Sequence, residues 1–244
     1  MKIGVYGMGR FGSFWAGCLA RTGNSVIAYS RSEHTYPSGV VNAAEDEVLS
    51  ADILFFCVTI SRFESVLENV KGRIGKDTIV CDTCSVKTYP AEWMEKHLDG
   101  ATYRIPTHPM FGPDSGKNGL ENLPLVMCPV MDRDERYEKV KNLFLSMGLR
   151  VIEMTPDEHD REAAFSQGVT HFIGRILSEM HLEPSEISTK GYKALLEIVE
   201  QTCNDPLSLF CDLQRYNPYT RDMRHDLRLA IENVGYMLEK GEKK

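Results

Sequence analysis

The chain has 244 residues, which is enough for one large domain or two modest ones. Its contents of 42% hydrophobic and 26% charged residues are typical of a globular protein. A formal net charge of -7 is opposite in sign to a surface that binds nucleic acid, so we expect no nucleic-acid partner. No run of about 18 apolar residues predicts a membrane span. Because Met1 leads directly into a strand-like run, we expect a cytoplasmic protein without a targeting peptide.

The first residues have the pattern of a dinucleotide-binding turn. Residues Lys2–Tyr6 form a strand-like run, Gly7, Gly9 and Gly12 form Gly-x-Gly-x-x-Gly, and residues 13–21 are periodic like a helix. Such glycines permit a tight turn, close approach to a pyrophosphate and close helix packing, and the helix start binds the anion. The alternative is a purely structural turn. The cofactor residues predicted here are Gly7, Met8, Gly9, Arg10, Phe11 and Gly12.

The end of the second predicted strand, Ser25–Tyr29, indicates which dinucleotide is bound. NAD sites carry an Asp or Glu there for the ribose 2′-hydroxyl, whereas Ser30-Arg31-Ser32 offers a cation and hydroxyls that suit the 2′-phosphate of NADP. Glu33 argues against a phosphate by its charge, and Arg31 could instead be a solvated loop residue. We predict NADP as the cofactor, bound in part by Ser30, Arg31 and Ser32.

Strand-like runs then alternate with helical segments. This pattern predicts a doubly wound, Rossmann-type parallel sheet. The further strand-like runs lie at 52–58, 78–82, 123–130 and 150–154, and the helical segments at 61–70, 88–98 and 133–147. We expect the last two strand-like runs to extend the same sheet. Since ligands bind beyond the carboxyl ends of parallel strands, Cys57, Val58 and Thr83 are added to the predicted cofactor site.

From Thr155-Pro156-Asp157 onward the pattern is helical, with breaks near Pro184, Pro206 and Pro218. We therefore predict a dinucleotide-binding domain at residues 1–155 and an all-helical domain at residues 156–244. The helical domain is too short to cover its own apolar residues, so we expect a homodimer through it. The alternative is that these residues pack on the first domain. They are Leu195, Leu196, Val199, Leu207, Leu209 and Phe210.

Seven cysteines are scattered over the chain, and an odd number at such spacing is typical of reduced thiols. Cys81 and Cys84 form a Cys-x-x-Cys pair, but no second pair or His cluster accompanies them. We predict no metal site.

Two loops at the carboxyl ends of strands carry candidate catalytic residues. The loop 82–87 contains Ser85, and the loop 107–113 begins with Thr107 and His108. Oxidation of an alcohol requires a base close to the hydroxyl, and neutral His108 is the best candidate, with Ser85 placed to orient it. The alternative for His108 is a loop residue bonded to backbone.

A third cluster lies on the first helix of the second domain. Gln167 and His171 are four residues apart and share a helix face, so we expect His171 to contact a substrate. His171 could alternatively be structural. We interpret His159 and Asp160, at the start of this helix, as a cap or hinge.

Together these residues resemble the prephenate and arogenate dehydrogenases of tyrosine biosynthesis. The motifs are Asp82-x-x-Ser85-x-Lys87, His108-Pro109-Met110, and His159-Asp160 followed by Ser166 and His171. More narrowly, residues 107–117, 189–192, 195–202 and 204–205 are similar to plant-type arogenate dehydrogenases. The resemblance implies oxidative decarboxylation of a cyclohexadienol, with His108 taking the hydroxyl proton and Ser85 as its hydrogen-bonding companion. Ser30-Arg31-Ser32 is likewise similar to NADP-selective members.

The resemblance also bears on the substrate. An acidic residue at the position matching Asp205 is associated in the family with arogenate, whose ammonium a carboxylate attracts. Many bacterial members hold the ring carboxylate with an Arg that has no obvious equivalent here, so Lys117, Gln167 or Gln201 are candidates in its place. The predicted substrate contacts are Ser85, Thr107, His108, Lys117, Gln167, His171, Gln201 and Asp205.

Three alternatives stay open at this point. Prephenate could be the substrate instead of arogenate. A β-hydroxyacid dehydrogenase has the same two-domain plan, but it carries a Lys four residues after the helix Gly, where this chain has Gly168 followed by Phe172. A non-catalytic NADP-sensing module would use the helical domain to contact a partner.

Overall fold

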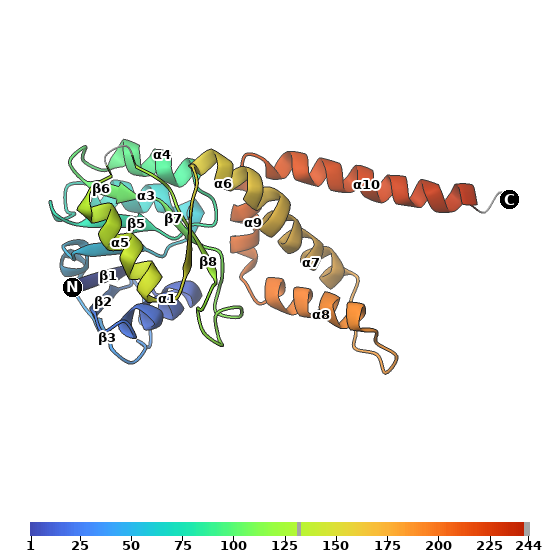
Figure 1. Cartoon of the computed structure of the whole chain (residues 1–244), viewed down its shortest axis with the longest axis horizontal. Coiled ribbons are helices and arrows are strands. Elements are labelled where there is room, and N and C mark those ends of the chain that lie inside the picture. The colour runs from blue at the N-terminus through green and yellow to red at the C-terminus, as the bar shows by residue number, and fades with distance from the viewer. Residues whose placement is uncertain (131–132, 242–244) are drawn as a thin grey trace. The chain divides into compact units, whose positions relative to one another are not determined.

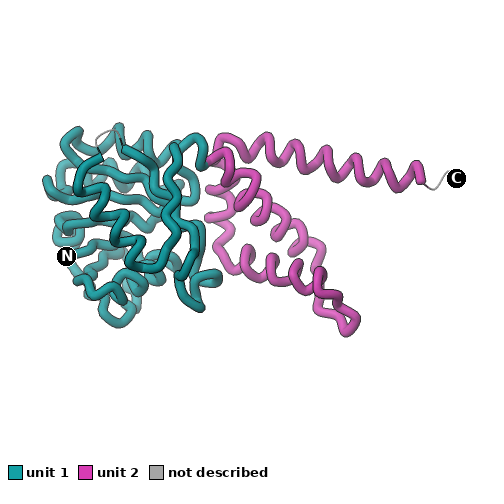
Figure 2. Tube along the Cα trace, viewed as in Figure 1, with its two compact units in different colours: residues 1–159 teal, residues 160–244 magenta. Residues whose placement is uncertain are grey.

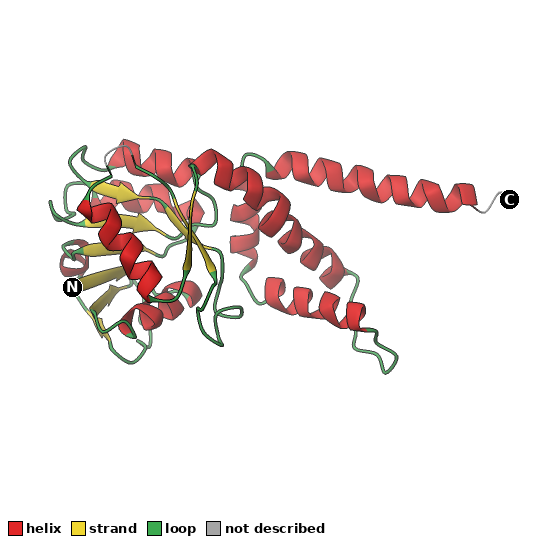
Figure 3. Ribbon diagram, viewed as in Figure 1, coloured by secondary structure: helices red, strands yellow, loops and turns green. Residues whose placement is uncertain are grey.

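A computed structural model describes residues 1–130 and 133–241 (Figure 1). The chain divides into two compact units, Met1–His159 and Asp160–Lys244 (Figure 2). The boundary predicted between residues 155 and 156 is the start of helix α6 (Pro156–Ala163), whereas the observed division falls inside that helix. His159 therefore belongs to the first unit, which contains all the strands of the described residues (Figure 3).

The first unit is built on a parallel sheet of six strands in the order β3-β2-β1-β4-β5-β6. The strands are β1 (Lys2–Tyr6), β2 (Ser25–Tyr29), β3 (Val40–Asn42), β4 (Ile53–Phe56), β5 (Ile79–Asp82) and β6 (Tyr103–Ile105). The predicted doubly wound fold is confirmed. Strand β3 was not predicted, because three residues are too few to show a period, and β6 ends just before the expected loop at residues 107–113. The strand order reverses between β1 and β4, where such sheets bind ligands.

One prediction about the sheet was wrong. Residues 123–130 and 150–154 do not extend the first sheet but contribute β8 (Pro124–Met127) and β9 (Arg150–Glu153) to a second, three-stranded sheet. Its third strand is β7 (Thr107–Pro109), which pairs antiparallel with β8. The chain changes sheets after β6 at Pro106, whose carbonyl accepts a hydrogen bond from Cys128 N. An apolar run shows that a strand is buried but not which strand it pairs with.

Helices cover both faces of the six-stranded sheet. They are α1 (Arg10–Ala20), α2 (Glu45–Leu49), α3 (Ile60–Val70), α4 (Thr88–His97) and α5 (Glu135–Ser146). Helix α1 begins earlier than the predicted start at residue 13, because Arg10–Gly12 of the glycine motif is already helical. This overlap places the first turn of α1 directly after the end of β1.

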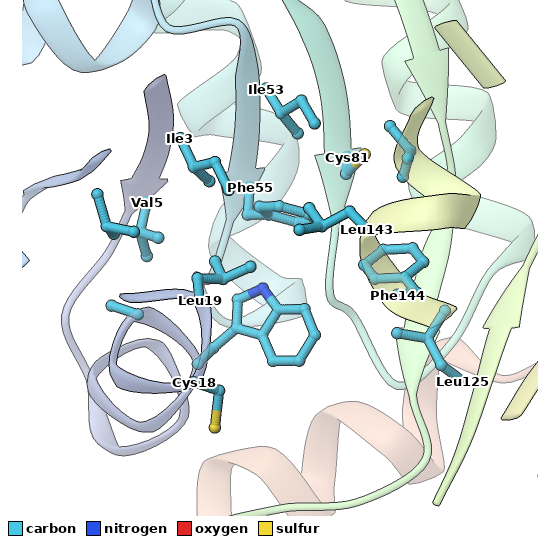
Figure 4. Close-up of a cluster of buried hydrophobic side chains, with 14 of the residues drawn as sticks. Ile3, Val5, Cys18, Leu19, Ile53, Phe55, Cys81, Leu125, Leu143 and Phe144 are labelled. Carbon is cyan, nitrogen blue, oxygen red and sulfur yellow. The ribbon is translucent and has the colours of Figure 1, made fainter. Parts of the chain in front are cut away.

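Alternation of side chains along the strands explains the two covered faces. Phe55 points toward α1 and α5, where its ring centroid lies 5.7 Å from Trp15 and 6.0 Å from Phe144 (Figure 4). Phe56 points to the other face and meets Phe63 of α3 at 5.7 Å. All five aromatic side chains are fully buried. Burial of such a side chain contributes about 1.5–3 kcal/mol, so this cluster fixes the sheet that carries the loops described below.

The second unit is helical in every described element. After α6 come a π-helical turn η1 (Ala164–Gly168) and the helices α7 (Val169–Glu179), α8 (Lys190–Cys203), α9 (Leu207–Tyr216) and α10 (Thr220–Gly241). The predicted breaks at Pro184, Pro206 and Pro218 fall between these helices. The π-turn was not predicted, and such turns occur often at functional sites. No helix within the described ranges combines the length and the apolar character that a membrane crossing requires.

Candidate active site

The glycine motif has the geometry of a dinucleotide-binding turn. Gly7 has a φ of 103°, and a Cβ on it would lie 2.5 Å from the carbonyl oxygen of Cys57. A Cβ on Gly12 would lie 2.0 Å from the carbonyl oxygen of Gly7. At Gly9, by contrast, a Cβ would meet nothing within 4 Å. Gly7 and Gly12 thus pack the turn, and Gly9 leaves open space at the start of α1 where a pyrophosphate could approach.

A cavity of about 540 Å³ lies beside this turn. Eight of the predicted cofactor residues line it: Gly7, Met8, Gly9, Ser30, Arg31, Ser32, Cys57 and Val58. Glu33 does not line it but borders a neighbouring cavity of about 330 Å³. Ser30, Arg31 and Ser32 line that neighbouring cavity as well, so the charge of Glu33 lies beside the residues expected to hold a phosphate. Burial raises the pKa of the Cys57 thiol to about 12, so this side chain is neutral at pH 7.

The remaining predicted cofactor residues do not line the cavity. Arg10, with its Nη2 2.5 Å from Asp114 Oδ2, Phe11 and Gly12 form the first turn of α1. The Thr83 hydroxyl donates to the Phe56 carbonyl at 3.0 Å. The side chain of Thr83 thus ties the end of β5 to β4 rather than facing the cavity.

The carboxyl end of β5 is joined to β7 by a buried ion pair. Asp82 and Lys87 are both fully buried and in contact, and Lys87 Nζ also donates to the Thr107 carbonyl at 2.6 Å. The carboxylate of Asp82 accepts from Thr107 N at 3.1 Å, and the Thr107 hydroxyl donates to the Asp82 carbonyl. Thr107, predicted to contact substrate, uses its hydroxyl to join the two strands. This network fixes the backbone immediately before His108.

His108 lies buried on β7 and is paired with another imidazole. Its Nδ1 is 2.8 Å from Nε2 of His159, which belongs to α6. A hydrogen bond at this distance needs one proton, so one ring donates and the other accepts. If His108 Nδ1 donates, its Nε2 is left unprotonated and can act as a base. The pair can therefore set the tautomer that catalysis requires.

Ser85 was expected to hydrogen-bond to His108, but it does not. Its Oγ is buried and has no hydrogen-bond partner within the described part of the chain. An unpaired buried hydroxyl costs about 1–3 kcal/mol, and such groups are commonly completed by a ligand or water.

The second unit carries the other predicted substrate residues. Gln167 lies in η1 and His171 in α7, and both Gln167 Oε1 and His171 Nδ1 are buried without a partner in the described residues. Burial lowers the pKa of His171, and the negative charge of Asp205 opposes this shift. Lys117 of the first unit and Gln201 of α8 are exposed. The structure thus groups Gln167, His171 and Asp205 within one unit.

The cysteine pair Cys81 and Cys84 is buried and free, and burial raises the pKa of both thiols. Within the described residues, no group of three or more His, Cys, Asp or Glu side chains is placed to hold a metal ion.

Comparison with known families identifies the chain. A model of the prephenate dehydrogenase nucleotide-binding domain matches residues 15–153, more than half of the sequence. The chain belongs to the prephenate and arogenate dehydrogenase family. A TYRAAT1-like C-terminal domain model matches residues 176–244. The family predicted from the motifs is confirmed.

Relatives in this family cover most of the chain. Two Arabidopsis thaliana proteins, named arogenate dehydrogenase 1 and 2, chloroplastic, are 36% and 37% identical over 246 residues. The matches cover 96% of this chain but 38% and 69% of the two relatives. A Methanocaldococcus jannaschii protein, named probable arogenate/prephenate dehydrogenase, is 26% identical over 233 residues, with 90% of this chain and 52% of the relative covered. The chain spans only part of the length of each of these proteins.

Solved structures agree on the fold. The arogenate dehydrogenase of Synechocystis superposes with a TM-score of 0.71 at 22% identity, covering 100% of this chain and 94% of that one. The prephenate dehydrogenase of Aquifex aeolicus, in complex with hydroxyphenyl propionate and NAD⁺, gives 0.75 at 17% identity, covering 100% and 92%. The likeness supports a doubly wound domain followed by helices.

The sequence interpretation missed the roles of several residues. His159 was taken for a cap or hinge, yet it is the ring that pairs with His108, fifty-one residues away in sequence. His34 and Arg62 line the predicted cofactor cavity, and neither was predicted. Arg62 lies at the start of α3, and a lone Arg on an exposed helix face gives no signal in a sequence.

Proposed function

We propose that this family member is an NADP-dependent arogenate dehydrogenase that forms tyrosine by oxidative decarboxylation. The observation that carries the proposal is the buried pair of His108 and His159 in the same unit as the glycine turn. When bound, NADP accepts a hydride from the ring carbinol carbon. The bond from the ring to its carboxylate breaks, carbon dioxide leaves, and that electron pair makes the ring aromatic.

His108 moves the proton in this scheme. Its Nε2 takes the proton from the ring hydroxyl as the hydride leaves and returns it to the phenol oxygen once the ring is aromatic. His159 supports this role by accepting from His108 Nδ1, which keeps Nε2 unprotonated before each turnover. The unpartnered hydroxyl of Ser85 is available to bind the same substrate oxygen.

The cavity lining supports NADP over NAD. Ser30, Arg31 and Ser32 all line it, and Glu33 lines only the neighbouring cavity that these three residues also border. A guanidinium with two hydroxyls can bind the dianionic 2′-phosphate, whereas a carboxylate at this place would repel it. A Schizosaccharomyces pombe relative, 26% identical over 179 residues, is named probable prephenate dehydrogenase [NADP(+)]. Replacing Arg31 by Ala is expected to raise the KM for NADP about tenfold and to leave the KM for NAD nearly unchanged.

Asp205 supports arogenate over prephenate. Arogenate carries an ammonium where prephenate carries a keto group, and the Asp205 carboxylate attracts the first and repels anionic prephenate. Prephenate dehydrogenase activity is the second candidate, since relatives of both names match the chain.

The direct test measures NADPH absorbance after mixing the protein with arogenate and NADP⁺. Parallel reactions replace arogenate by prephenate and NADP⁺ by NAD⁺. The proposal expects the largest kcat/KM with arogenate and NADP⁺. Binding of NADP without oxidation of either substrate would favour the sensing module and contradict an enzyme.

We also propose that two copies associate through the helical unit. Of the six residues named for this interface, Leu195 is 37% and Leu207 is 62% exposed, and the others are half-buried. Helix α10 adds an apolar face of Ile231, Val234 and Leu238, each more than half exposed. The cytoplasmic location stays a prediction, and the Arabidopsis relatives carry the word chloroplastic in their names.

A further inference from the structure

Arg175 joins two helices of the second unit at the place where Asp205 lies. Its side chain projects from α7, and its Nη2 donates to the Asp205 carbonyl at 2.7 Å and to the Thr202 carbonyl at 3.3 Å. We propose that Arg175 is a positioning residue that fixes Asp205 and thereby sets the preference for a substrate with an ammonium group. This inference rests on the proposed function, because it uses Asp205 as the residue that selects arogenate.

The segment that Arg175 holds is the connection between α8 and α9. Helix α8 ends at Cys203, and the last carbonyls of a helix have no partner within it. Asn204 and Asp205 then form the connection to α9, which begins at Leu207. A guanidinium at this end also complements the negative end of the α8 dipole. Arg175 thus donates from α7 to one carbonyl of the last turn of α8 and to one carbonyl of the connection that follows it.

The packing around Arg175 leaves it little freedom. The preceding residue, Gly174, lies so close to α8 that a Cβ on it would be 2.0 Å from Thr202 Oγ1. The guanidinium carbon lies 5.6 Å from the centre of the Phe210 ring on α9, and that ring stacks on Phe172 of α7. The three helices therefore meet at Arg175. A planar guanidinium is suited to this place, because it can stack on a ring and donate to two carbonyls at once.

Asp205 lies where its charge acts on the neighbouring polar residues. Burial lowers the pKa of His171, the Asp205 carboxylate opposes this shift, and the Arg175 guanidinium adds to it. His171 and Arg175 are one helical turn apart on α7. If the backbone at Asp205 moved away, the carboxylate would leave this group, and the attraction for an ammonium would weaken.

The test is a double-mutant cycle on substrate preference. The kcat/KM for arogenate and for prephenate is measured in wild type, Arg175→Lys, Asp205→Asn and the double variant. Lysine keeps the charge but cannot stack and donate in the same plane. We expect Arg175→Lys and Asp205→Asn each to lower the arogenate-to-prephenate ratio about tenfold, and the double variant to fall no further than Asp205→Asn alone.

A matched control is Arg224→Lys. Arg224 is another half-buried Arg of the second unit, and its Nη1 donates to the Gln214 carbonyl at 3.0 Å. This variant should leave the substrate ratio unchanged. A shift equal to that of Arg175→Lys would show a general loosening of the unit and would overturn the inference.

The possible outcomes separate the inference from the function on which it rests. An effect of Asp205→Asn without one of Arg175→Lys overturns the role of Arg175 alone. No effect of Asp205→Asn overturns the selection of arogenate by Asp205 and the inference with it. If a variant has no measurable turnover, the pKa of His171 is measured by NMR, with the signal assigned by its loss in His171→Gln. The pKa of His171 should fall in Arg175→Lys as the carboxylate moves away, and an unchanged pKa contradicts the inference.

Discussion

The two units bury their apolar side chains to very different degrees. In the first unit Trp15, Phe55 and Phe144 form one aromatic cluster under the sheet. In the second, the buried hydrophobic residues of the described chain are Ala163, Ala164, Leu213 and Met223. A well-packed unit holds a proton-transfer group rigidly, whereas a unit with so small a core depends on polar contacts and on a partner. The residue proposed to move the proton, His108, lies in the first unit, and Asp205, proposed to select the substrate, lies in the second.

The largest effect should come from removing the proposed base. His108→Gln is expected to lower kcat by about 10²–10⁴-fold, because the transition state loses general-base catalysis. If the division between the units is correct, the loss is the same with arogenate and with prephenate. Steady-state kinetics with both substrates measure this. Near-wild-type turnover would remove His108 from the mechanism, and a selective loss with one substrate would contradict the division.

The next effect concerns the buried ion pair that holds β7. Lys87→Met leaves Asp82 charged, buried and without its partner, which is expected to lower the free energy of unfolding by about 3–5 kcal/mol. The matched variant is Asp82→Asn combined with Lys87→Met, which removes both charges. Its free energy of unfolding should fall by less than that of Lys87→Met alone. Urea unfolding followed by tryptophan fluorescence reports on the first unit, which contains both tryptophans. Equal losses in the two variants would contradict an electrostatic cause.

The glycine turn and the surroundings of His108 show what a sequence can and cannot predict. The glycine turn is readable because Gly7, Gly9 and Gly12 are neighbours in sequence and each has a local geometric reason. The role of Thr107 could not be predicted from the sequence, because its partners Asp82 and Lys87 lie twenty or more residues away. The pair of His108 and His159 depends on how α6 lies against β7 within the first unit. No period or spacing in the sequence encodes that contact.

The third effect tests whether His159 acts through His108. His159→Leu removes the acceptor for His108 Nδ1 and is expected to lower kcat by about 10–100-fold with little change in KM, as for other residues that orient a catalytic imidazole. His159→Gln keeps a side-chain acceptor and should recover part of the loss. Melting temperatures of both variants separate this from unfolding. Equal activity of the Leu and Gln variants would show that His159 has only a packing role.

The smallest effect on turnover is expected at the apolar face of α10. The exposed fractions of Ile231, Val234 and Leu238 are 58%, 57% and 68%, and a second copy of the chain would cover them. Val234→Glu places a charge in that contact and should shift the molar mass measured by light scattering from dimer to monomer. Glu232→Lys, on another face of the same helix, is the control and should stay dimeric. Because His108 and its partners lie in the first unit, the monomer should retain most of its kcat, provided that the second unit keeps its fold. A wild-type chain that is monomeric at all concentrations would mean that the small core of the second unit suffices, and the contrast between the units would then lie in packing alone.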